Sequence, residues 1–154
     1  MSANKLYLED FAVGMTFEAG PVRLSEAQIL AFAKEFDPQP FHLDEEAARR
    51  THFGGLVASG WHTACLAMRI VVDGLLDDST SMGSPGLEKL EWLRPVRPDD
   101  PLTLTVEVLE ARPSRSKPDR GSVKFGYSLV NSAGETVFTQ VAWVIFGRRT
   151  PGVT

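Results

Sequence analysis

The chain has 154 residues, which is enough for one domain and hardly enough for two. Its 43% hydrophobic and 23% charged residues are usual for a soluble globular protein and exclude disorder, collagen and coiled coil. The net charge of −4 argues against a general nucleic-acid binder, because such proteins gain affinity by neutralising phosphates.

Helices are expected after one short strand in a lead-in that ends near residue 24. Ser25 and Gln28 have the spacing of a capping box, and apolar residues then recur at helical spacing along one face (Ile29, Phe32, Ala33 and Phe36). The two prolines in 37–40 must end this helix, since a residue before proline avoids the helical conformation. A second, short helix is predicted over 45–50.

A longer helix is predicted from Gly60 to about residue 72. Its side chains are apolar on nearly every side, and a helix of this kind is usually buried. We therefore expect a central helix, with His62 as a core histidine whose hydrogen bonds are satisfied. Cys65 is expected to be a small buried hydrophobe.

The last part of the chain, 87–147, is patterned as strands. Apolar and polar residues alternate over 102–108 and again over 122–129, which is typical of half-buried strands. A turn is predicted at 131–134, and the final strand, 137–146, is apolar on both faces and is expected in the centre of the sheet. Helices followed by an antiparallel meander around one buried helix indicate an α+β architecture.

The strongest functional signal lies between Asp37 and Asp44. Asp37 and His42 stand five residues apart on a stretch stiffened by two prolines, so both side chains can reach one small cavity. Such a pair suits acid–base work on a bound water, and a stiff segment favours the fixed geometry that catalysis needs. A purely structural interpretation stays open, because aspartate before proline is common in turns.

A second signal is the start of the predicted central helix. The first turn of a helix offers free backbone N–H groups and the positive end of its dipole, and Gly60 lets another molecule approach the backbone closely. A thioester oxygen that gains negative charge could be stabilised there, as in an oxyanion hole. A plain glycine start to a core helix is the alternative, and these residues alone favour it.

Together these segments resemble the MaoC-like dehydratases, which are related to the (R)-specific enoyl-CoA hydratases and have the hotdog fold. Phe36–Asp44 is similar to the family's Asp-x-x-Pro-x-His-x-Asp motif, Phe53–Trp61 to the run into its central helix, and Leu93–Asp100 to a strand end with a proline-bearing turn. The resemblance covers about residues 5–147. It implies one MaoC-like hotdog domain over 1–154, with an antiparallel sheet wrapped around a long central helix.

The resemblance implies reversible addition of water across a trans-2-enoyl-CoA or a related acyl thioester. Asp37 and His42 would hold and activate the water, and the N–H of Gly60 would stabilise the thioester oxygen, with Ser59 and Trp61 beside it in substrate binding. No metal and no cofactor is implied, because coenzyme A enters as part of the substrate. A homodimer or a higher homo-oligomer is expected, with no nucleic-acid or membrane partner.

The chain departs from the family pattern at three places. Gln39 stands where the motif usually has Asn, Ser59 stands where a His often precedes the helix-start glycine, and Ala67–Arg69 occupy a turn where the hydratases often carry a Ser. The acid–base pair is intact. The differences therefore bear on the acyl chain and the identity of the substrate.

Two other functions fit the same residues. A hotdog acyl-CoA thioesterase is one, because a fold does not settle a function, and a non-catalytic acyl-thioester-binding dimer is the other. Phe41, Trp61 and Met68 are candidate cavity walls. The basic run Arg112–Arg120 is expected to be a solvated hairpin loop, with a contact to the phosphates of coenzyme A as the alternative. His52 has no spacing to the other histidines that is typical of a metal site.

A cytoplasmic location is expected. The first seven residues lack the apolar core of a signal peptide, and the longest apolar stretches are shorter than the roughly 20 residues that span a bilayer. The single cysteine, Cys65, cannot form an internal disulfide and fits a reducing compartment.

Overall fold

The structure, a computed structural model, describes residues 5–152, so the predicted domain bounds of 1–154 extend beyond the described residues at both ends. In chain order the elements are the 3-10 helix η1 (Leu8–Asp10), strand β1 (Thr16–Val22), helices α1 (Glu26–Phe36), α2 (Pro40–Leu43), α3 (Glu45–Arg49) and α4 (Gly60–Val71), the π-helical turn η2 (Val72–Leu76), and strands β2 (Gly86–Trp92), β3 (Leu102–Pro113), β4 (Arg120–Val130) and β5 (Thr136–Gly147). Within the described range, no helix has the length and apolar character needed to cross a membrane.

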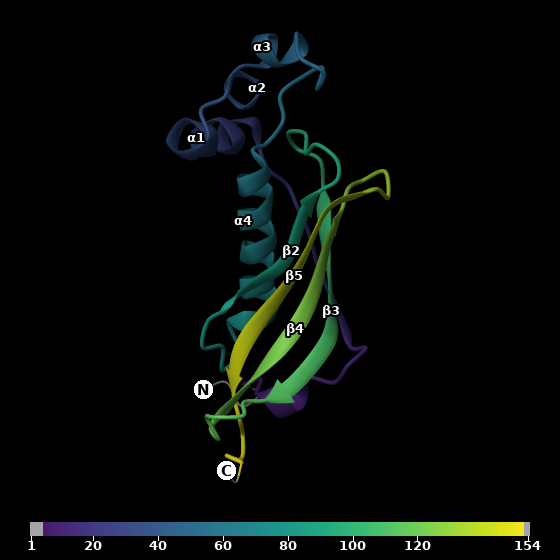
Figure 1. Cartoon of the computed structure of the whole chain (residues 1–154). Helices are drawn as coiled ribbons and strands as arrows, with labels where there is room; N and C mark the ends of the chain where they lie inside the picture. Colours follow the sequence, from purple (N-terminus) through teal and green to yellow (C-terminus); the bar gives the residue numbers. More distant parts are fainter. Residues whose placement is uncertain (1–4, 153–154) are drawn as a thin grey trace.

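The five strands form one antiparallel sheet in the order β1-β3-β4-β5-β2. The sheet curves along one side of α4, while α1, α2 and α3 lie together at one end of the molecule (Figure 1). This arrangement confirms the α+β class and the sheet around a central helix that the hotdog resemblance implies. The final predicted strand, β5, lies inside the sheet between β4 and β2, but the middle strand is β4.

Local sequence signals account for the ends of α1. Ser25 Oγ accepts a hydrogen bond from the N–H of Gln28 (3.1 Å), and Gln28 Oε1 accepts one from the N–H of Ser25 (2.9 Å), so the predicted capping box is confirmed. The helix ends at Phe36, immediately before the proline-bearing segment, as expected. Ile29 and Ala33 are fully buried and hold α1 against the rest of the core.

The main core lies between the sheet and α4. Alternate residues of β3 and β4 are buried, and they pack with buried apolar side chains of α4 (Leu66, Ala67, Ile70 and Val71). The alternation of apolar and polar residues that predicts these strands therefore corresponds to one face against the helix and one face turned outward.

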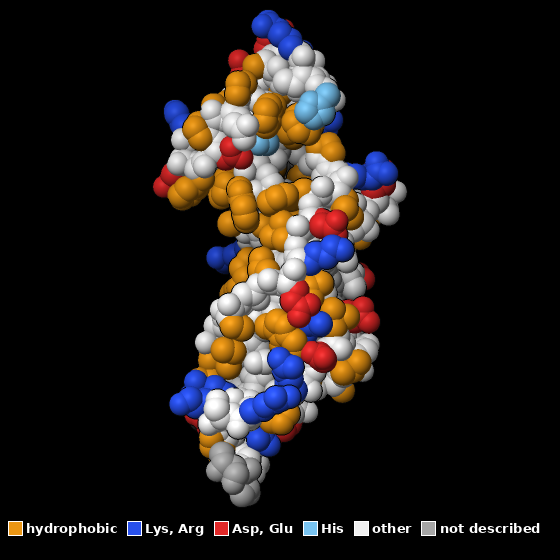
Figure 2. All heavy atoms as spheres, in the orientation of Figure 1, with side chains coloured by type: hydrophobic (Ala, Val, Ile, Leu, Met, Phe, Trp, Pro, Cys, Tyr) orange, Lys and Arg blue, Asp and Glu red, His pale blue; other side chains and the backbone are white. Residues whose placement is uncertain are grey.

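The expectation that α4 is buried on all sides is wrong. Trp61 is 58% exposed, Met68 is 51% exposed, and Cys65 is exposed rather than buried. The physical reason is that the sheet of this chain covers only one side of the helix, so the apolar residues on the other side face outward (Figures 1 and 2).

His62 is also not the satisfied core histidine that the sequence suggests. Its ring stacks on Phe32 of α1, with 4.5 Å between ring centroids and an interplanar angle of 4°. Its buried Nδ1 has no hydrogen-bond partner among residues 5–152. Because burial disfavours the charged imidazolium, the pKa of His62 lies below its ordinary value.

Candidate active site

The turn between α1 and α2 places the first two predicted site residues. Asp37 directly follows α1, and its backbone N–H donates to the carbonyl of Ala33 (2.8 Å). Pro40 then begins α2, a position where proline loses no helical hydrogen bond. His42 therefore lies on a short helix that the sequence does not predict, and this turn brings it back toward Asp37.

The side chains of Asp37 and His42 lie close together. His42 Nε2 lies 3.4 Å from Asp37 Oδ2, and the His42 residue is only 6% exposed. His42 Nδ1 lies 2.7 Å from the carbonyl oxygen of Val57, which can only accept, so Nδ1 carries a hydrogen. In the neutral ring Nε2 is then an acceptor, and a water placed beside Nε2 and Oδ2 can donate one hydrogen to each.

Hydrogen bonds hold Asp37 in its ionised form. Ser59 Oγ donates to Oδ2 and Gln39 Nε2 donates to Oδ1, each at 2.7 Å. Burial raises the pKa of Asp37, but these two hydrogen bonds and the nearby His42 outweigh it, so the pKa lies below its ordinary value. The Asp37 side chain keeps 18% of its surface exposed, which leaves the carboxylate accessible to water.

Ser59 connects the carboxylate to the start of α4. It occupies the position before the helix, where a serine hydroxyl usually accepts from the first turn. Here Ser59 is fully buried, its hydroxyl donates to Asp37 instead, and it makes no side-chain cap bond. Within residues 5–152, the N–H of Gly60 makes no hydrogen bond, so the positive end of α4 is uncapped.

Trp92, at the end of β2, covers Gly60. Its indole Nε1 donates to the carbonyl of Gly60 at 2.6 Å, and a Cβ at position 60 would lie 2.6 Å from the indole carbon Cε2. Only glycine fits under this ring without movement. Trp61 turns to the outer side of α4, where its ring contacts Trp92 edge-on at 5.1 Å between centroids.

His42 and Gly60 both line one cavity of about 550 Å³. This volume is typical of a small-molecule site. Residues of α2, of the run from His52 to Thr63, and of the run from Trp92 to Arg97 form its walls. The prediction of Phe41 as a wall is confirmed.

The other predicted site residues lie beside or outside this cavity. Asp37 and Ser59 do not line the cavity themselves, but Asp37 lies beside His42 and Ser59 directly precedes Gly60. Trp61 and Met68 are on the outer face of α4 and do not line the cavity. Sequence reasoning missed Trp92 as a wall, because no local pattern links a strand end to the start of a helix 32 residues earlier.

The basic run Arg112–Arg120 includes the predicted hairpin loop, 114–119, with the end of β3 before it and the start of β4 after it. The N–H of Ser114 donates to the carbonyl of Arg120 at 3.0 Å, and the Arg120 guanidinium pairs with Asp119. This loop lies at the opposite end of the sheet from α2 (Figure 1). Over the part of the chain that the structure describes, no three His, Cys, Asp or Glu side chains are grouped to hold a metal ion.

Comparison with known proteins gives the same family as the resemblance. Residues 10–129 match the model of the MaoC-like domain. The chain is 34% identical over 117 residues to a 3-hydroxybutyryl-CoA dehydratase of Methylorubrum extorquens, which covers 73% of this chain and 69% of that protein. It is also 35% identical over 111 residues to YdeM of Bacillus subtilis, an uncharacterized protein. This alignment covers 71% of this chain and 78% of YdeM.

The fold has a similar solved structure. The MaoC-like dehydratase from Rhodospirillum rubrum has 48% sequence identity to this chain, and its crystal structure superposes with a TM-score of 0.85. The match covers 94% of this chain and 99% of that chain.

Proposed function

Because this chain belongs to the MaoC-like dehydratase family, we propose that it is a hydro-lyase that adds water reversibly across the double bond of a trans-2-enoyl-CoA. The relative named as a 3-hydroxybutyryl-CoA dehydratase supports a coenzyme A thioester of a short acyl group. The observation that carries the proposal is the Asp37–His42 pair beside the uncapped start of α4. One MaoC-like domain over the whole chain would perform the reaction.

In the proposed first step, Asp37 and His42 hold the attacking water. Asp37 stays ionised because Ser59 and Gln39 donate to it, so it is a weak base and serves to orient the water. The hydrogen bond from Nδ1–H to Val57 fixes the His42 ring and leaves Nε2 free to accept. Nε2 therefore takes a proton from the water as the hydroxide attacks the β-carbon. The Asp37 carboxylate then stabilises the imidazolium that forms.

In the proposed second step, charge moves onto the thioester oxygen. The free N–H of Gly60 and the positive end of the α4 dipole lie in the same cavity as His42 and can stabilise that oxygen. The enolate then takes a proton from the His42 imidazolium at the α-carbon, which restores both the carbonyl and the neutral ring. In this scheme the water supplies both the hydroxyl group at the β-carbon and the proton that His42 passes to the α-carbon, so we propose no resident metal or cofactor.

The test is the loss of enoyl-thioester ultraviolet absorbance with short- and medium-chain trans-2-enoyl-CoAs. Asp37→Asn and His42→Ala, each checked for folding by circular dichroism, should lower kcat about 10²- to 10⁴-fold, the usual contribution of an acid–base group. Release of free thiol would indicate a thioesterase instead. Binding without turnover, unchanged in both variants, would indicate a non-catalytic acyl-thioester binder.

We also propose that the protein forms a homodimer through the uncovered side of α4. Apolar side chains that are about half exposed lie on this side of α4 (Trp61 and Met68), on β2 (Leu87) and directly after β2 (Leu93), and hydrophobic surface lies over this part of the molecule (Figure 2). The edge of β2 that does not face β5 has no strand partner within the described chain. An exposed apolar face and an open sheet edge are both stabilised by a second copy.

A further inference from the structure

Residues 51–56, which we call the loop, are part of the connection between α3 and α4 and form one wall of the cavity. His52 and Phe53 line the cavity, and the Phe53 ring packs against Phe41 of α2 with 5.2 Å between centroids. The loop contains neither helix nor strand. Its own turn is closed by a bond from the N–H of Gly54 to the carbonyl of Thr51 (3.0 Å), so bonds from other elements are needed to place this turn against the cavity.

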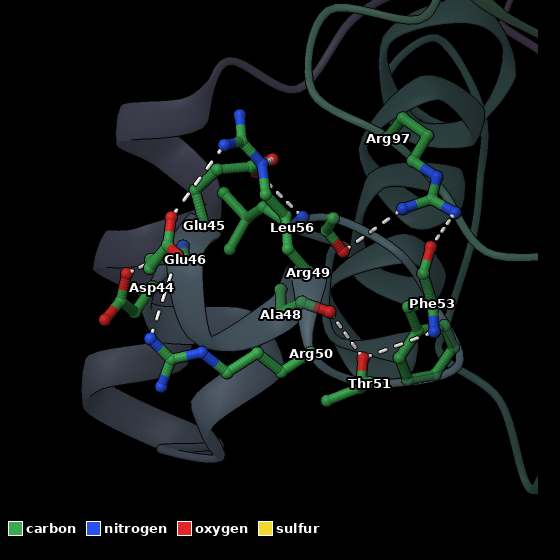
Figure 3. A network of polar contacts seen from close by, with 11 residues as sticks. Asp44, Glu45, Glu46, Ala48, Arg49, Arg50, Thr51, Phe53, Leu56 and Arg97 are labelled. Atoms are coloured by element: carbon green, nitrogen blue, oxygen red, sulfur yellow. Dashed lines mark hydrogen bonds and ion pairs between the residues drawn. The ribbon is translucent and has the colours of Figure 1, made fainter.

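Two charged side chains hold this backbone from its two sides (Figure 3). From α3, Glu45 Oε2 accepts from the N–H of Leu56 at 2.8 Å. From the segment after β2, Arg97 Nη1 donates to the carbonyl of Gly55 at 3.1 Å, and Arg97 Nη2 donates to the carbonyl of Phe53. Both residues bond to the main chain, so the contact depends on where the loop runs and not on its side chains.

These bonds matter because the end of the loop is buried. Gly55 and Leu56 are both buried, and a buried N–H or carbonyl without a partner is costly. Gly55 is also tightly enclosed, since a Cβ there would lie 3.2 Å from Glu45 Oε1 and 3.4 Å from Arg97 Nη1. If either charged side chain is lost, the backbone must move to find water or another partner.

We propose that Glu45 and Arg97 are positioning residues that set which acyl groups the cavity accepts, because together they fix the loop that carries Phe53. This inference rests on the proposed function, in that the cavity is taken to hold the acyl group of a thioester. Glu45 is the cleaner probe, since it does not line the cavity and acts on it only through the loop, whereas Arg97 also forms part of the wall.

The experiment measures binding of saturated butyryl-, hexanoyl- and octanoyl-CoA by isothermal titration calorimetry, so it does not need turnover. Glu45→Ala removes the acceptor, whereas Glu45→Gln keeps a carbonyl oxygen for the N–H of Leu56. Glu46→Ala is the matched control, because the ion pairs of this neighbouring carboxylate within residues 5–152 are to Arg49 and Arg50, at 3.8 and 3.7 Å, and none is to the loop. Circular dichroism verifies that each variant is folded.

In Glu45→Ala the loop moves outward, so butyryl-CoA loses its contact with the wall and octanoyl-CoA gains room. We expect the ratio of octanoyl to butyryl affinity to rise about fivefold, which is close to 1 kcal/mol, and the amide of Leu56 to lose protection from hydrogen exchange. Glu45→Gln and Glu46→Ala should keep the wild-type ratio and protection.

The inference is overturned if the ratio does not change in Glu45→Ala, or if Glu46→Ala changes it equally. Failure of the folded wild type to bind any of the three acyl-CoAs would overturn it as well. Hydration is scored in the separate absorbance assay. If the wild type binds these acyl-CoAs but hydrates none of the enoyl thioesters, the proposed reaction is refuted. The role of the loop is then still decided by the ratio of octanoyl-CoA to butyryl-CoA affinity.

Discussion

The packing of Trp92 on Gly60 gives a quantitative prediction about the start of α4. In Gly60→Ala the new methyl group would lie 2.6 to 2.9 Å from three indole atoms, which is closer than such contacts allow. Overpacking of this kind typically costs about 1–3 kcal/mol. Because Trp92 is 44% exposed and can move outward, we expect the overpacking cost to be at the lower end of this range, about 1 kcal/mol. The outward movement of Trp92 also breaks the hydrogen bond from its indole N–H to the Gly60 carbonyl, which destabilises the fold by roughly another 1 kcal/mol.

We therefore expect Gly60→Ala to lower the free energy of unfolding by about 2 kcal/mol. The measurement is urea denaturation followed by circular dichroism, at one protein concentration for all variants because self-association would shift the midpoint. The control is a double-mutant cycle with Trp92→Leu, which removes the ring. In that background the methyl group meets no indole, and Gly60→Ala should cost less than about 0.5 kcal/mol because alanine favours the helix over glycine.

The reasoning is refuted if Gly60→Ala costs the same with and without the indole. Coupling below about 0.5 kcal/mol would mean that the two positions act independently. The destabilisation would then come from the backbone at position 60 and not from the ring above it.

Three further predictions concern acidity, the core and assembly. Ser59→Ala removes a donor to Asp37 and raises the pKa of that carboxyl, so the titration of the Asp37 carboxyl carbon followed by NMR should move to higher pH, whereas Ser59→Thr should restore it; an unmoved titration would contradict the role of Ser59. Ile29→Ala empties a fully buried position and should lower the unfolding free energy by about 2–5 kcal/mol in urea denaturation; a loss under about 1 kcal/mol would show that α1 contributes little to the core. Met68→Glu places a charge on the uncovered side of α4 and should convert a dimer to a monomer in light scattering, and an unchanged mass would move the interface elsewhere.

The parts of the fold that the sequence predicts are those set by local physics. Ser25 and Gln28 define the start of α1 because both partners lie within one turn, and Pro38 fixes its end. The alternation in β3 and β4 predicts strands because one face packs on α4. By contrast, α2 is only four residues long, too short for any hydrophobic period to be visible.

The rest of the candidate site depends on contacts between distant segments. Ser59 reaches Asp37 across 22 positions, and Arg97 reaches Phe53 across 44, so neither bond leaves a local pattern. The exposure of Cys65 was mispredicted for a related reason. The apolar surface of α4 predicts that the helix is covered, but composition does not say whether the cover comes from the same chain.

If Asp37 acts as proposed, the bond from Ser59 to Asp37 favours activity at the expense of helix stability. A side chain that capped α4 would stabilise the helix by about 1 kcal/mol, but it would occupy the N–H groups and abandon the carboxylate. Selection for heat resistance alone would therefore favour replacements at position 59 that inactivate the proposed enzyme. A thermostability screen of this chain should hold that position constant.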